Sequence, residues 1–174
     1  MGLTSEKALI EINKLFDLCF EANAMADRMV YELDIKFNCP KFSEWLHHKI
    51  AHLFPVWADK IQEYGSLRGD MFYRGMIPEQ KQDYLNISSL LETLTMKVVE
   101  IERQCVKSIH ISADTNSEGY EDMLRDFNFT TISPLIKQAT VLYTMAKDYE
   151  NSGNAYKINK DFDAWVIPQF KGDD

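Results

Sequence analysis

The sequence predicts an all-α protein, folded as a four-helix bundle with a long connector between the second and third helices and a C-terminal tail. Apolar residues recur at intervals of three and four, the helical period, along four long segments. The chain has only seven glycines and five prolines, and most of them fall where a helical interpretation needs breaks. With 174 residues it is long enough for one domain with a buried core.

The first predicted helix begins at Thr4-Ser5-Glu6-Lys7, a sequence that can cap a helix, and runs to about Phe37. Asn38-Cys39-Pro40 ends it. Its expected buried face carries Ala8, Ile12, Leu15, Phe16, Cys19, Ala22, Ala26, Val30 and Leu33.

The second predicted helix runs from about Lys41 to Tyr64, where Gly65 is expected to stop it. Pro55 lies inside it and lacks an N–H, so a kink is expected there. The apolar residues of this helix are Leu46, Ile50, Leu53, Phe54, Trp57, Ile61 and Tyr64.

The connector GSLRGDMFYRGMIPEQ contains three glycines and a proline. Its four large apolar residues predict that it packs against the helices; they are Met71, Phe72, Tyr73 and Met76. The third helix is expected from Pro78 or Glu79 to about His110. Its stripe is Ile87, Leu90, Leu91, Leu94, Val98, Ile101, Cys105 and Ile109.

The fourth predicted helix runs from about Tyr120 to Asn151, after the polar break SADTNSEG, with Pro134 inside it. Its expected core residues are Leu124, Phe127, Ile132, Leu135, Ile136, Ala139, Leu142, Tyr143 and Ala146. Residues 1–150 therefore form the predicted bundle, and residues 151–174 a tail. The aromatic ending DFDAWVIPQF predicts that the tail docks on its own bundle or on a neighbouring subunit. A short turn, a long connector and a short turn place the second and third helices parallel.

Composition excludes several classes of function. Nineteen Lys and Arg stand against 27 Asp and Glu, a net charge of −8, and the basic residues are scattered, so nucleic-acid binding is not expected. No apolar run approaches the ~18 residues of a membrane span. Cys19, Cys39 and Cys105 form no CxxC pair and the first residues do not resemble a signal peptide. We therefore expect reduced, partly buried cysteines and a cytoplasmic protein.

Three of the four histidines lie in EWLHHKIAHLFPVWADKIQE, residues 44–63. At roughly 100° per residue, His48, His52, Asp59 and Glu63 fall within an arc of about 60° and span about 22 Å along a helix. Each pair four residues apart can supply two ligands, and imidazole and carboxylate suit iron, zinc or manganese. The row is too long for one ion, so another helix or subunit has to complete a site.

The apolar residues of the same helix lie on its opposite side, so the row is expected to face away from the core. This orientation favours a metal site between subunits. In a two-fold dimer that pairs the first and second helices, Asp27 or Asp34 can meet the row from the partner. Two alternatives stay open: a solvated face that carries histidines by chance, and a polar interface without metal.

Three stretches resemble the ferritin-like superfamily, and most closely its Dps-type mini-ferritins, over residues 8–147. KFNCPKFSEWLHH is similar to the family's passage from first to second helix, and WADKIQEYGSLRGD to the end of its second helix. SADTNSEGYEDMLRDF is similar to the start of its fourth. The resemblance implies a homo-oligomer, a dimer or larger shell, that binds iron, oxidises Fe(II) with peroxide or oxygen as a ferroxidase, and stores it.

In this resemblance His47 or His48 matches the second-helix histidine, and Asp59 and Glu63 match the acidic pair. Combined with the helical spacing, this gives His48, His52, Asp59 and Glu63 as the expected ligands, with Asp27 and Asp34 as partner candidates. The chain departs from the family in two ways. The first-helix histidine motif is missing, and Tyr31 and Asp34 of MVYELDIKF stand in its place. The acidic pair also lies a few residues too close to the histidine. The alternative function is therefore a ferritin-like bundle without metal chemistry, acting as a protein-interaction or assembly module with a protein partner.

Overall fold

The computed structural model describes residues 4–172, which contain helices and no strand. The predicted all-α class is confirmed. The long helices are α1 (Glu6–Tyr31), α3 (Leu53–Arg68), α4 (Ile87–Asp114), α5 (Glu118–Phe127) and α6 (Ser133–Asn151). Short α-helices are α2 (Pro40–Leu46) and α7 (Ile158–Asp161). Three π-helical turns are η1 (Glu32–Lys36), η2 (His47–Ala51) and η3 (Asn128–Ile132). The tail adds the 3₁₀ turns η4 (Ala155–Lys157), η5 (Phe162–Trp165) and η6 (Pro168–Phe170).

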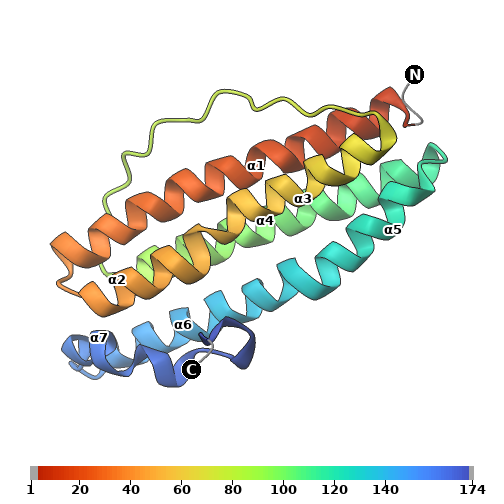
Figure 1. The fold of residues 1–174 in the computed structure, drawn as a ribbon. Coiled ribbons are helices and arrows are strands. Elements are labelled where there is room, and N and C mark those ends of the chain that lie inside the picture. Colours follow the sequence, from red (N-terminus) through yellow and green to blue (C-terminus); the bar gives the residue numbers. More distant parts are fainter. Residues whose placement is uncertain (1–3, 173–174) are drawn as a thin grey trace.

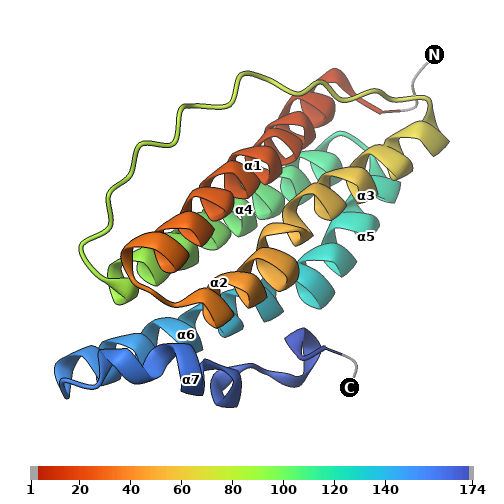
Figure 2. The same ribbon diagram turned by 60° about the vertical axis from the view of Figure 1, so that its left-hand side comes forward.

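The helices lie side by side along one long axis (Figure 1). α1 runs antiparallel to the continuous segment α2–η2–α3, and the connector then returns along α1 (Figures 1 and 2). α4 consequently runs parallel to α3, as predicted, and α5–η3–α6 runs back. α1 packs against α3 and α4, and α4 packs against α5 and α6.

Three predicted helix boundaries were wrong, and one of them is the end of α4, which lies at Asp114 and not at about His110. α4 begins at Ile87, several residues after Pro78, because Asn86 and Ser89 form a capping box. The Asn86 side chain accepts a 2.8 Å hydrogen bond from the Ser89 N–H, and the Ser89 hydroxyl accepts from the Asn86 N–H. The second helix does not stop at Gly65 but continues to Arg68, and Gly69 ends it with a left-handed φ of 76°.

Pro55 and Pro134, the prolines inside the predicted helices, each follow a π-helical turn. Proline has no N–H to donate to the carbonyl four residues earlier, and in both cases a side chain donates to that carbonyl instead. Ala51, four residues before Pro55, accepts 3.1 Å from the Asn23 side-chain amide. Thr130, four residues before Pro134, accepts 3.2 Å from the Gln169 side chain in the tail. Remote side chains thus satisfy both freed acceptors.

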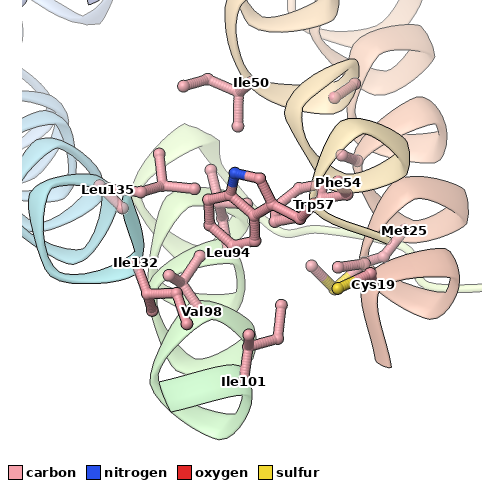
Figure 3. Close-up of a cluster of buried hydrophobic side chains, with 14 of the residues drawn as sticks. Cys19, Met25, Ile50, Phe54, Trp57, Leu94, Val98, Ile101, Ile132 and Leu135 are labelled. Carbon is pink, nitrogen blue, oxygen red and sulfur yellow. The ribbon is translucent and has the colours of Figure 1, made fainter. Parts of the chain in front are cut away.

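The predicted apolar stripes meet in one core (Figure 3). Trp57 is 2% exposed and lies among Cys19 of α1, Leu94 of α4 and Ile132 of η3. Its ring packs edge-on against Phe127 at 5.6 Å, which joins α3 to α5. The middle of the molecule is therefore filled with apolar side chains.

The connector packs less than predicted. Of its four apolar candidates only Phe72 is buried, whereas Met71, Tyr73 and Met76 are 67%, 68% and 94% exposed. Tyr84 is buried at its far end. Hydrogen bonds between the Asn13 and Asp17 side chains of α1 and the connector backbone add to the packing of Phe72.

The tail lies against α2 and α6. The Phe162 ring is 4.9 Å from that of Phe42 and 5.8 Å from that of Trp45. The Gln138 side chain in α6 donates to the Trp165 carbonyl and accepts from the Ile167 N–H. Within the described residues, no helix has the length and apolar character needed to cross a membrane.

Candidate functional site

The three histidines of residues 47–52 lie together at the π-helical turn η2. The ring centres of His47 and His52 are 4.5 Å apart, those of His47 and His48 5.0 Å, and those of His48 and His52 5.5 Å. The His52 N–H bonds the His47 carbonyl, five residues earlier, at 3.2 Å. In an α-helix only His48 and His52, four residues apart, would be neighbours. The π turn also brings residues five apart together, so His47 lies beside His52 as well.

The predicted row faces away from the core. His48, His52, Asp59 and Glu63 are all exposed, and His47 is half-buried. Val56 lies on the same outer face and is 58% exposed. We call His48, His52, Asp59 and Glu63 the α3 row. His48 lies in η2 and His52 directly precedes α3, whereas Asp59 and Glu63 lie in α3 itself.

One chain does not bring the two halves of the α3 row together. Asp59 and Glu63 follow His52 by seven and eleven residues, about 10 and 16 Å along a helix. Among residues 4–172, no group of three or more His, Cys, Asp or Glu side chains is arranged to hold a metal ion. Within one chain, the histidines and the acidic pair therefore cannot bind the same ion.

The two aspartates proposed as partners differ in position. Asn23 bonds Ala51, and the Ser43 hydroxyl bonds the Val30 carbonyl at 2.8 Å, which fixes the antiparallel register of α1 and α2. Asp27, one turn after Asn23, therefore lies level with His47 in the same chain. Asp34 lies beyond Val30 in η1, level with the turn before α2. The register places Asp27, and not Asp34, at the height of the histidines along the helix axis.

A buried carboxylate that the sequence analysis did not single out lies at the end of α1. Glu32 is 6% exposed, pairs with Arg28, and has Lys36 at 3.6 Å. Lys36 also pairs with Asp83 and donates to the Tyr84 carbonyl. Burial and the Glu32 charge raise the pKa of Tyr84 to about 12. The i, i+4 spacing of Arg28, Glu32 and Lys36 was the available signal. This cluster anchors the connector where it enters α4.

A second buried carboxylate lies near the opposite end of α1. Asp70 is 6% exposed and accepts from the Thr4 hydroxyl at 2.6 Å and the Tyr120 hydroxyl at 3.1 Å. Burial, with the Asp70 charge, raises the pKa of Tyr120. The Arg68 guanidinium lies 5.6 Å from the centre of the Tyr120 ring. These contacts join the start of the connector to α5.

The three cysteines are free, and all of them are buried, more fully than predicted. Burial raises the pKa of all three thiols, that of Cys105 to about 12. They stay protonated near neutral pH and are poor nucleophiles or metal ligands.

No protein-family model matches the chain, and no curated protein matches it.

Proposed function

We propose that the chain is a ferritin-like four-helix bundle of the Dps type, which binds Fe(II) at a site shared by two copies and oxidises it with oxygen or peroxide as the electron acceptor. The observation that supports it most is the α3 row, because histidines and an acidic pair occupy one exposed helix face. The parallel course of α3 and α4, with the long connector between them, also fits this class of bundle.

A two-fold axis beside the middle of the α3 row completes the site. If two α3 helices pair antiparallel about the midpoint between His52 and Glu63, His52 of each copy faces Glu63 of the other. Val56 then faces Asp59 of the second copy, which places the exposed apolar side chain near the axis. Two equal sites result, each with histidines from one chain and carboxylates from the other.

These ligands suit iron as a substrate. Imidazole nitrogen and carboxylate oxygen bind Fe(II), and carboxylates favour the ferric product. Asp27, level with His47, can add a carboxylate from the histidine-bearing chain. The net charge of −8 favours the approach of cations.

An aerobic Fe(II) titration of the purified protein tests this function. Ferric absorbance should rise faster than in a protein-free control and saturate at a fixed ratio of iron to subunit. Asp59→Ala with Glu63→Ala should return the rate to the control while sedimentation shows an unchanged assembly. Glu118→Ala with Asp122→Ala, an exposed pair of the same spacing on α5, should keep wild-type rates. Wild-type rates equal to the protein-free control would contradict iron oxidation.

A scaffold without metal chemistry is the second candidate. The exposed connector side chains Met71, Tyr73 and Met76 favour it, because large exposed apolar groups mark interaction surfaces. This function predicts that Fe(II), Zn(II) and Mn(II) leave the thermal unfolding midpoint of the protein unchanged. It also predicts that Tyr73→Ser with Met76→Ser weakens the association of the chain with other protein chains.

A further inference from the structure

A groove on the outer side of α1 takes no part in the proposed iron site. It has a volume of about 440 Å³ and lies between α1 and the first residues of the connector. We call it the α1 groove. Its lining consists of Glu6, Leu9, Ile10, Asn13, Lys14, Met71 and Tyr73.

Side-chain hydrogen bonds from α1 hold the groove in shape. The Asn13 side chain accepts from the Tyr73 N–H at 2.8 Å and donates to the Tyr73 carbonyl at 2.9 Å. Asp17 accepts from the Gly75 N–H at 2.7 Å. Each of these contacts fixes the backbone of the connector, so the groove exists before any partner binds.

The extended connector presents apolar side chains to the groove. In an extended chain, alternate residues point to opposite sides. Phe72 accordingly points inward and is 6% exposed, while Met71 and Tyr73 on either side of it are 67% and 68% exposed. Ile10 on α1 is 50% exposed. The groove therefore carries an exposed apolar patch on a fixed backbone, a feature of interaction sites.

The charged residues of the groove can form ion pairs with those of a second copy of the chain. Glu6 and Lys14 each lie four residues from Ile10, one on either side, so all three share one face of α1. If two α1 helices cross antiparallel with Ile10 at the axis, Glu6 of each chain meets Lys14 of the other. The two ion pairs lie about 12 Å apart along the helix. A parallel arrangement would oppose like charges.

We propose that the α1 groove is a contact between two copies of this chain, related by a two-fold axis beside Ile10. Ile10 packs against its counterpart, and Met71 and Tyr73 of the connector extend the apolar contact beside it. The Glu6–Lys14 pairs set the antiparallel direction. In the single chain Lys14 pairs with Glu11 at 2.8 Å, yet its side chain is 52% exposed and can bond both carboxylates. The groove and the α3 row use different residues, so this contact does not depend on iron binding.

Charge exchange in the full-length protein tests the contact by sedimentation equilibrium. Glu6→Lys and Lys14→Glu should each weaken self-association roughly tenfold, because each opposes like charges at both pairs. The combined variant, Glu6→Lys with Lys14→Glu, should restore association, because the two-fold pairing is recreated with the signs exchanged. Ile10→Arg should abolish the α1-groove contact and leave no assembly larger than the dimer paired through α3. Glu118→Lys, on the exposed face of α5, should leave it unchanged.

Three outcomes would overturn the proposal: a monomeric wild type, single reversals without effect, or a combined variant as dissociated as either single one. A groove that binds a different protein gives the second outcome. Fe(II) oxidation by the same variants separates the two proposals. Two independent sites are shown if oxidation rates fall only in Asp59→Ala with Glu63→Ala, and if only the α1-groove variants reduce the assembly to the dimer paired through α3.

Discussion

The side-chain amide of Asn23 donates a 3.1 Å hydrogen bond to the carbonyl oxygen of Ala51, four residues before Pro55. In a regular helix that oxygen would accept the N–H of residue 55, which proline lacks. α1 thus provides the donor that the second helical segment cannot provide itself. The same contact fixes the height of the histidine turn relative to α1.

Asn23→Ala should lower the free energy of unfolding by about 1–2 kcal/mol, because Ala51 is buried and its carbonyl would lose a donor. In a Pro55→Ala background the residue at position 55 has an N–H for that oxygen. There the cost of Asn23→Ala should fall below about 0.5 kcal/mol. Urea unfolding of the four proteins of this cycle measures the coupling. Strictly additive costs would show that Pro55 and Asn23 act independently.

Gln169 provides the matched comparison at the other proline. It bonds the Thr130 carbonyl, but both residues are exposed, so water can replace the amide. Gln169→Ala should therefore cost less than about 0.5 kcal/mol. A cost as large as that of Asn23→Ala would mean that burial does not set the difference.

Glu11 should make stability depend on acid pH. Its carboxylate bonds Lys14 at 2.8 Å, Gln104 at 2.9 Å and Lys107 at 3.1 Å, and these contacts lower its pKa from 4.5 to about 2. Between these values the unfolded chain binds more protons than the folded one at this site, so stability falls as pH falls from about 4.5 to about 2. Glu11→Gln should lower stability at neutral pH and flatten this part of the curve.

Urea midpoints of wild type and Glu11→Gln across that range measure the difference. Glu118→Gln is the control, because Glu118 is exposed. Parallel pH curves for wild type and Glu11→Gln would rule out Glu11 as the source of the acid sensitivity.

Gly65→Ala should destabilise the protein although alanine favours helix. A Cβ at Gly65 would lie 2.7 Å from the Phe72 ring and 3.3 Å from the Tyr120 hydroxyl, and both residues are buried. Overpacking of this kind costs about 1–3 kcal/mol, more than the ~1 kcal/mol gain in helix propensity. Thermal or urea unfolding measures it, with Ser66→Ala, exposed on the same helix, as control. A more stable Gly65→Ala variant would show that the connector can move away from α3.

Helical periodicity predicted the buried faces because burial depends on spacing that the sequence displays directly. Leu94, Val98 and Ile101 are buried at the predicted positions. The start of α4 was missed because a proline followed by acidic and polar residues resembles a helix start. The stronger local signal, Asn86 followed by Ser89, lay eight residues further on.

The candidate site was predicted only in part. The outward direction of His52, Asp59 and Glu63 follows from the apolar residues on the opposite side of α3. The 4.5 Å approach of the His47 ring to the His52 ring could not be predicted from α-helical spacing, because a π turn changes which residues are neighbours. The hydrogen bond between Asn23 and Ala51 joins residues 28 positions apart, and such a contact leaves no periodic pattern in the sequence.

The last prediction concerns Asn159, through which the tail stabilises the start of α2. Its side-chain oxygen accepts from the Lys41 N–H at 2.9 Å and the Phe42 N–H at 3.1 Å, as a capping residue would. Asn159→Ala should cost about 1 kcal/mol and speed amide hydrogen exchange at these two positions. Asn154→Ala should leave exchange there unchanged, because the Asn154 side chain bonds only Ser152. Unaltered exchange at Lys41 and Phe42 in Asn159→Ala would show that α2 begins without help from the tail. Since α2 leads directly into the histidine turn, faster exchange that spreads to His47 would mean that the tail also holds the candidate site in place.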